Sequence, residues 1–121
     1  MPRVRVCCVQ LFARDVNDRE RSLKEALEAV QRASSSGGEI VVLPEAVYPG
    51  YVLDRWARDS ASPDEAKQVL ALFQEKARIC GVYIALGLPL FRGGDWLSGA
   101  VLMDRCFLRK VSDFFGILTR G

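Results

Sequence analysis

The spacing of apolar residues along the chain predicts an α/β fold of five strands and two helices. Short runs that are apolar throughout, or that alternate with polar residues, predict the strands at 3–11, 39–43, 82–88, 99–103 and 107–111. Two longer stretches, 17–33 and 62–80, repeat apolar residues at the spacing of an amphipathic helix. The segment 45–61 has neither pattern. The predicted order is therefore β-α-β-loop-α-β-β-β.

Capping residues mark the ends of both helices. The sequence NDRE at 17–20 predicts a capping box that opens the first helix at Asn17. The sequence SPDE at 62–65 predicts a second capping box, with proline at the first helical position. Gly81 is the expected end of the second helix, because glycine adopts the left-handed conformation common at that position.

The alternation of strands and helices predicts right-handed crossovers and a largely parallel sheet. The runs 40–43 and 82–88 are apolar at nearly every position, which is typical of strands that are covered on both faces. The two helices are enough to cover one face. In such sheets the residues that carry out chemistry lie just past the carboxyl ends of the strands. The first position to inspect is therefore the one after Leu43.

Composition narrows the classes of function. The 121 residues are 50% apolar and 26% charged, and a net charge of +2 arises from interspersed charges, so we expect one globular domain and no nucleic-acid partner. No apolar run approaches the roughly 20 residues of a membrane span, so we expect no membrane partner. The absence of histidine excludes Ser-His-Asp and Cys-His catalysis within this sequence. No residues have the spacing of a metal or nucleotide site, so we expect no metal and no cofactor.

The four cysteines, Cys7, Cys8, Cys80 and Cys106, show no CxxC spacing. The first residues of the chain lack the apolar centre of a signal peptide. We therefore expect reduced thiols in a cytoplasmic protein. Their simplest role is as small apolar side chains in strands and at a helix end.

Two charged residues are candidates for catalysis. Glu45 follows a buried apolar strand near two tyrosines, an environment that suits a general base. A solvated loop carboxylate or a helix-capping partner would show the same pattern. Lys110 stands among apolar residues on the last strand, where an ammonium group can stabilise an oxyanion. An exposed lysine on a strand would look the same.

Three aromatic residues of the loop, Tyr48, Tyr51 and Trp56, are candidates for the apolar wall of a substrate pocket. A loop that packs on its own aromatic rings would have the same composition. Both interpretations remain open at this point.

Four segments, taken in order, resemble the start of the nitrilase superfamily of carbon–nitrogen hydrolases. They are VCCVQ at 6–10, IVVLPEAVYPGY at 40–51, IALGLP at 84–89 and SGAVLMD at 98–104. The resemblance runs from about 2 to 110, which is nearly the whole chain. It implies the amino-terminal half of an α-β-β-α sandwich, with a partial hydrolase domain at 1–111 and a divergent tail at 112–121.

The resemblance also implies roles for particular residues. The family acts on small nitriles or amides through a glutamate, a lysine and a cysteine. Glu45 matches the glutamate, which is a general base, and Lys110 matches the lysine that stabilises the oxyanion. Lys110 is also the only lysine after Lys76. We expect Glu45 to lie close to Lys110 with its carboxylate facing inward rather than into bulk water.

The sequence departs from the family after Lys110. The family's nucleophilic cysteine lies well beyond its lysine, whereas no cysteine follows Lys110 here. The family's second glutamate would also follow the lysine, and no glutamate follows Lys76. The hairpin before Lys110 is shorter than is usual in the family. We therefore expect a truncated chain that is inactive on its own.

Three interpretations of function follow. The first is the amino-terminal part of a carbon–nitrogen hydrolase that takes a small nitrile or amide once completed. The second is an inactive truncated paralogue or isoform that binds or regulates a full-length hydrolase. The third is an α/β domain whose resemblance is only ancestral. In each case we expect a homo-oligomer or hetero-oligomer, because the second apolar face of the sheet needs cover.

Overall fold

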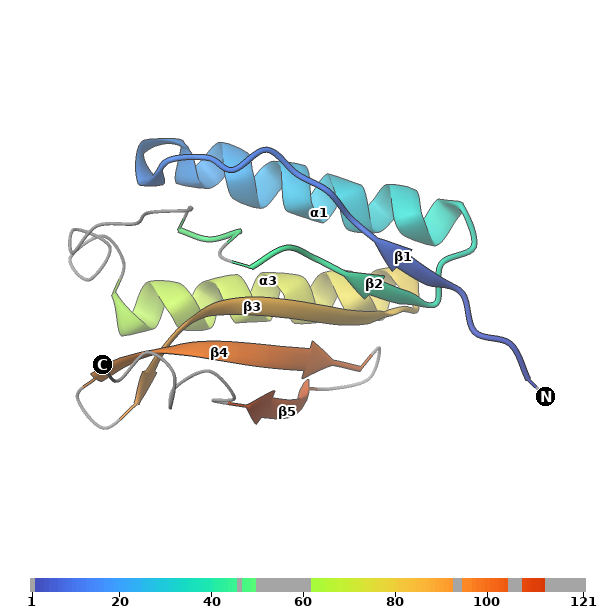
Figure 1. The fold of residues 1–121 in the computed structure, drawn as a ribbon. Helices are drawn as coiled ribbons and strands as arrows, with labels where there is room; N and C mark the ends of the chain where they lie inside the picture. The colour runs from blue at the N-terminus through green and yellow to red at the C-terminus, as the bar shows by residue number, and fades with distance from the viewer. Residues whose placement is uncertain (1, 46, 50–61, 93–94, 105–107, 113–121) are drawn as a thin grey trace.

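The computed structural model describes residues 2–45, 47–49, 62–92, 95–104 and 108–112. Its elements in chain order are β1 (Val6–Cys8), the 3₁₀ helix η1 (Val16–Asp18), α1 (Arg19–Ser35), β2 (Ile40–Val42), α3 (Pro63–Cys80), β3 (Tyr83–Arg92), β4 (Asp95–Met103) and β5 (Leu108–Ser112). The predicted α/β fold and order of elements are confirmed (Figure 1).

The five strands form one mixed sheet in the order β1-β2-β3-β4-β5. The pairs β1–β2 and β2–β3 are parallel, and the pairs β3–β4 and β4–β5 are antiparallel. The prediction of a largely parallel sheet is therefore wrong for the pair β3–β4, whereas β4 and β5 form the hairpin expected before Lys110. Only residues 93 and 94 separate β3 from β4, and a connection this short allows only antiparallel pairing.

Strand β3 is longer than predicted. The sequence suggested that Pro89 ends the strand, but β3 continues to Arg92 with Pro89 paired to Ser98. Strand β2 pairs with β3 only as far as Ala85. Pro89 therefore lies where β3 has one paired neighbour, and an edge position of this kind tolerates the missing amide hydrogen.

One face of the sheet packs on both helices, which lie behind the sheet in Figure 1. The sheet and the residue before β3, Val82, contribute side chains that are at most 3% exposed: Val41, Val82, Ile84, Leu86, Val101 and Met103. The helices contribute equally buried ones: Ala26 and Val30 from α1, and Val69, Phe73 and Ala77 from α3. This layer is the hydrophobic core.

The other face of the sheet is open to solvent. Val6, Val42 and Leu102 expose 54%, 36% and 41% of their surface. The pattern predicted strands covered on both faces, and the structure covers them on one. The reason is that α1 and α3 pack on the same side of the sheet (Figure 1). We call this surface the open sheet face.

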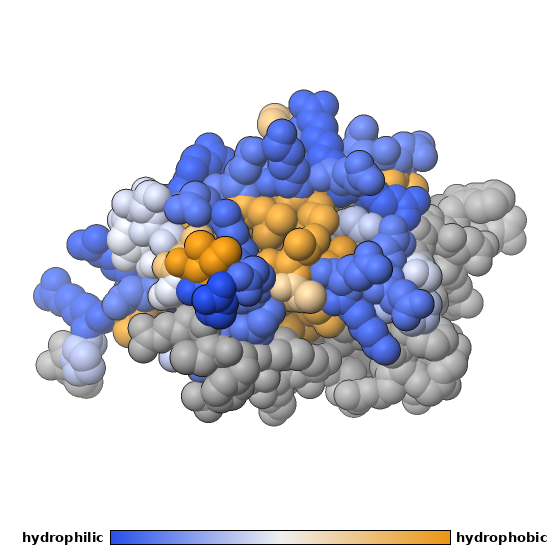
Figure 2. Space-filling model, turned by 180° about the vertical axis from the view of Figure 1, so that it is seen from behind, coloured by the Kyte–Doolittle hydropathy of each residue, from blue (hydrophilic) through white to orange (hydrophobic). Residues whose placement is uncertain are grey.

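The side opposite the open sheet face is the outer side of the helices, seen in Figure 2. Apolar side chains occupy the middle of this view, with polar side chains around them (Figure 2). Leu72 and Ile79 of α3 are among the exposed apolar residues, at 47% and 63%. Among the described helices, none is both long enough and apolar enough to cross a membrane.

The two helices differ in how well their starts were predicted. The capping box of α3 is present: the Glu65 amide donates to the Ser62 hydroxyl at 3.1 Å, and the Ser62 amide donates to the Glu65 carboxylate at 3.3 Å. Gly81 ends α3 with φ of 66°, as predicted. The capping box expected at Asn17 is absent, because Asp15 accepts from the Asn17 amide and caps η1 instead.

Candidate functional site

Glu45 lies in a turn directly after β2, at the carboxyl edge of the parallel part of the sheet. The Leu43 amide donates to the Ala85 carbonyl at 2.9 Å, so the chain stays paired to β3 until just before the turn. A Cβ atom on Gly87 would lie 3.6 Å from the Glu45 Cγ. The aliphatic part of Glu45 therefore lies over the backbone of β3 at Gly87.

Glu45 is exposed, contrary to the expectation that its carboxylate faces away from water. The physical reason is the alternation of side chains along β3. Leu86 points into the core, so the next position, Gly87, belongs to the open sheet face. Glu45 lies over that face, which no described residue shields.

The chain after Glu45 is held by α1. The buried hydroxyl of Ser22 donates a hydrogen bond to the Val47 carbonyl. Val47 itself is 5% exposed and belongs to the core. The turn is therefore attached to β3 on one side of Glu45 and to α1 on the other.

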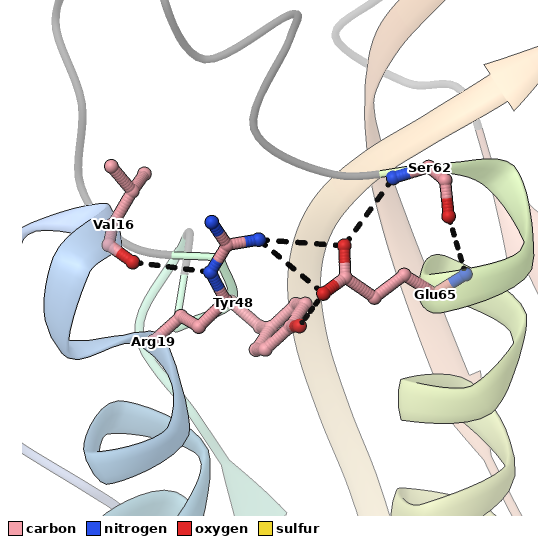
Figure 3. A network of polar contacts seen from close by, with 5 residues as sticks. All are labelled: Val16, Arg19, Tyr48, Ser62 and Glu65. Atoms are coloured by element: carbon pink, nitrogen blue, oxygen red, sulfur yellow. Dashed lines mark hydrogen bonds and ion pairs between the residues drawn. The ribbon is translucent and has the colours of Figure 1, made fainter.

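A second attachment runs through Tyr48 to α3 (Figure 3). The Tyr48 hydroxyl donates to the Glu65 carboxylate at 2.7 Å. The Arg19 guanidinium donates to the two oxygens of the same carboxylate at 3.3 and 3.5 Å, and its Nε donates to the Val16 carbonyl at 3.2 Å. We call Arg19, Tyr48 and Glu65 the clamp.

The clamp shifts the pKa values of its members in opposite directions. Burial, together with the nearby Glu65 carboxylate, raises the pKa of Tyr48 to about 12. The hydrogen bond from Tyr48 lowers the pKa of Glu65 below its usual value, and the Ser62 amide and Arg19 act in the same direction. Glu65 is therefore charged at neutral pH and Tyr48 keeps its proton.

The aromatic wall predicted from the loop is only partly within the described residues. Tyr48 is 6% exposed, and its hydroxyl is used by Glu65, so it acts in packing here. Tyr51 and Trp56 lie outside the described residues, and their contact with a substrate stays a prediction. The sequence indicated Glu65 only as a capping residue. Its bond to Tyr48 joins residues 17 positions apart and left no local signal.

Lys110 is placed by its backbone alone. It lies in β5 and pairs with Leu102 of β4, while Gly87 of β3 pairs with Ala100 of the same strand. The backbone of Lys110 is thus two strands from the position over which Glu45 lies, or about 10 Å across the sheet. The Lys110 side chain lies outside the described part, so the shared site remains a prediction.

A small cavity of about 260 Å³ adjoins Glu45 on the side of α1. Its other lining residues are mostly apolar: Leu11, Phe12, Ala13, Arg14, Ser22, Pro44 and Val47. The sequence did not indicate that residues 11–14 line this cavity, because the first strand was expected to run to Leu11. Instead β1 ends at Cys8, and the chain then passes beside the Glu45 turn.

Three cysteines are described, and all are free thiols. Cys7 lies beside Gly38 on the helix side of the sheet, and Cys80 donates to Gln31 at the end of α3. Cys8 lies on the open sheet face of β1, two strands from Gly87. Cys106 is outside the described residues. Within the described ranges, no three Cys, Asp or Glu side chains are grouped to hold a metal ion.

Comparison with known proteins assigns the chain to a family. Residues 5–106 match the model of the carbon-nitrogen hydrolase family. A glutamine-dependent NAD(+) synthetase from Thermotoga maritima is 32% identical over 115 residues, which are 93% of this chain and 20% of that protein. The family match ends four positions before Lys110.

Solved structures show the same fold. An amidase from Nesterenkonia sp. superposes with a TM-score of 0.76 at 23% identity, over 89% of this chain and 41% of that one. A glutamine-dependent NAD(+) synthetase from Cytophaga hutchinsonii superposes with a TM-score of 0.67 at 23% identity, over 89% of this chain and 18% of that one. The chain thus spans about a fifth of the curated relative and about two fifths of the amidase. On the match of residues 5–106, it belongs to the carbon-nitrogen hydrolase family.

Proposed function

We propose that this chain contributes the glutamate and the lysine of a site that hydrolyses small amides. The observation that carries the proposal is the place of Glu45, in the turn after β2 and beside a cavity of about 260 Å³. The relatives favour an amide over a nitrile, since one is named a glutamine-dependent synthetase and another an amidase. The substrate class we propose is a primary carboxamide.

In the proposed reaction Glu45 takes the proton of a cysteine thiol, and the thiolate adds to the amide carbon. Lys110 stabilises the oxyanion that forms. The C–N bond then breaks as the nitrogen receives the proton, which leaves ammonia and a thioester. Glu45 next removes a proton from water, whose oxygen attacks the thioester. The carboxylic acid leaves and the thiol is restored.

The nucleophile in this proposal comes from outside the 121 residues. Of the described cysteines, Cys7 lies beside Gly38, Cys80 is bonded to Gln31, and Cys8 is two strands from Gly87. In a glutamate-to-leucine mutant of one amidase of the same fold, 22% identical, the acetamide moiety of fluoroacetamide adds covalently at the active-site cysteine. That protein supplies the precedent for a cysteine nucleophile, and this chain covers 42% of it.

The purified chain alone should release no ammonia above background from glutamine, acetamide or acetonitrile. The reason is that loss of the nucleophile lowers the rate by several orders of magnitude. The measurement is an ammonia assay with and without the chain. Labelling of any of its four cysteines by a thiol-reactive amide analogue, with turnover lost in the matching serine variant, would contradict this prediction.

The mass and the activity of the natural protein distinguish the proposal from its alternative. An intact mass above the 13.5 kDa of this chain shows that the natural protein is longer. In a longer, active protein, Glu45→Gln should abolish ammonia release. Glu39→Gln, an exposed glutamate at the other end of β2, should leave it unchanged.

The alternative is an inactive truncated paralogue or isoform that binds or regulates a full-length hydrolase, and the open sheet face favours it. In that case the natural product has the mass of this chain and co-purifies with a hydrolase. The domain at 1–111 would then be the part that binds the partner. Of the tail at 112–121, all but Ser112 lies outside the described residues.

A further inference from the structure

Glu65 joins three segments that are far apart in the sequence. Its carboxylate accepts hydrogen bonds from the Tyr48 hydroxyl, the Arg19 guanidinium and the Ser62 amide (Figure 3). Arg19 begins α1, and Ser62 caps α3. Tyr48 lies three positions after Glu45. One carboxylate thus ties the starts of both helices to the chain that leaves the Glu45 turn.

This arrangement restrains the turn from both sides. Before Glu45 the backbone is bonded to β3, and after it the Val47 carbonyl is bonded to α1. Tyr48 adds an attachment to α3, because its ring is buried and its hydroxyl is bonded to Glu65. Glu45 lies between these fixed points, and among the described residues it makes no hydrogen bond of its own that could replace them.

We propose that Glu65 is a positioning residue for Glu45: through Tyr48 it keeps the turn at Glu45 in the conformation that holds the Glu45 side chain over β3 at Gly87. The catalytic consequence of this inference rests on the proposed function. The geometric effect does not, since it concerns the turn alone.

The bond between Tyr48 and Glu65 is the decisive contact of the clamp. Arg19 and Glu65 expose about a third of their side chains, at 31% and 32%, so their ion pair contributes little. The Tyr48 hydroxyl donates to a charged acceptor from a buried ring, and charge-assisted bonds of this kind are the stronger ones. Tyr48→Phe removes this bond and leaves the capping box and Arg19 intact.

The test is cleavage by a glutamate-specific protease, because its rate at a site follows the population of locally open chain. The sites compared are the bonds after Glu45 and after Glu39, with products identified by mass. Glu39 is exposed at the opposite end of β2 and serves as the internal reference. The variants are Tyr48→Phe and Glu65→Gln. The matched control is Glu75→Gln, which breaks a pair within α3, to Arg78.

We expect cleavage after Glu45 to rise about tenfold or more in Tyr48→Phe, the factor that corresponds to a charge-assisted hydrogen bond. Glu65→Gln should also raise it, and the double variant should not exceed the larger single effect by much, since both remove one contact. Cleavage after Glu39 should change less than about twofold, because Glu39 is exposed at the start of β2 and local opening there leaves the clamp intact. Glu75→Gln should change neither.

A purely structural role would raise cleavage at both sites together, and that result would overturn the inference. Unchanged cleavage after Glu45 in Tyr48→Phe would overturn it as well. The proposed function fails separately: if Glu45→Gln leaves ammonia release by the natural protein unchanged while the cleavage result holds, the turn is positioned by Glu65 but Glu45 is not the base.

Discussion

Among single residues, Tyr48 gives the structure a measurable pH dependence. Its pKa is about 12 in the folded chain, because the ring is buried next to the Glu65 carboxylate, against about 10 in an unfolded one. A raised folded pKa stabilises the fold fully below pH 10, and this stabilisation is lost as the pH rises from 10 to 12. We expect a tyrosinate absorbance step near pH 12.

The step should disappear in Tyr48→Phe and remain in Tyr83→Phe, which removes a tyrosine of β3 outside the clamp. Absorbance that rises in a single transition near pH 10 would show that the Tyr48 ring is not buried in solution. The measurement needs no substrate, so it tests the clamp independently of any activity.

Among the elements, the start of α1 has two possible caps, Asp15 in the structure and Asn17 from the sequence, which mutation can distinguish. The structure places the cap at Asp15, whose carboxylate accepts from the Asn17 amide at 3.2 Å. Asp15→Ala should therefore lower the free energy of unfolding by about 0.5–1 kcal/mol. Asn17→Ala should change it little, because the structure uses the backbone of Asn17 for this cap. Urea unfolding of both variants measures the difference. A larger loss of stability in Asn17→Ala than in Asp15→Ala would instead support the capping box at Asn17.

For the whole molecule, the open sheet face predicts association. Val6, Val42 and Leu102 are exposed apolar residues on this face, and burying such a side chain fully contributes about 1.5–3 kcal/mol. We expect the chain to be a dimer or larger at micromolar concentration, with this face buried against a second copy or a partner. Sedimentation and light scattering measure the mass.

Val42→Lys should shift the assembly toward the monomer, because it places a charge on the open sheet face. Ile79→Lys is the matched control, since Ile79 is exposed on α3 and not on the sheet. A monomer that unfolds cooperatively and binds no hydrophobic dye would contradict the prediction. It would mean that another part of the chain covers this face.

The sequence by itself determined the α/β order and both ends of α3. Ser62, Glu65 and Gly81 act within one helical turn, so their effect is visible in a short stretch of sequence. The position of Glu45 after β2 was predictable for the same reason, because it follows a short apolar run directly. The motifs around it also carried the resemblance to the family that the comparison confirms.

Tertiary structure decided what depends on distant neighbours. Pro89 remains in β3 because β2 stops pairing at Ala85, and Glu45 is exposed because both helices pack on the other face of the sheet. Tyr48, which composition suggested for a substrate wall, is bonded to Glu65 from 17 positions away. Side-chain pairing between helices and turns leaves no periodic signal in the sequence, so only the folded chain shows that Glu65 both caps α3 and bonds to Tyr48.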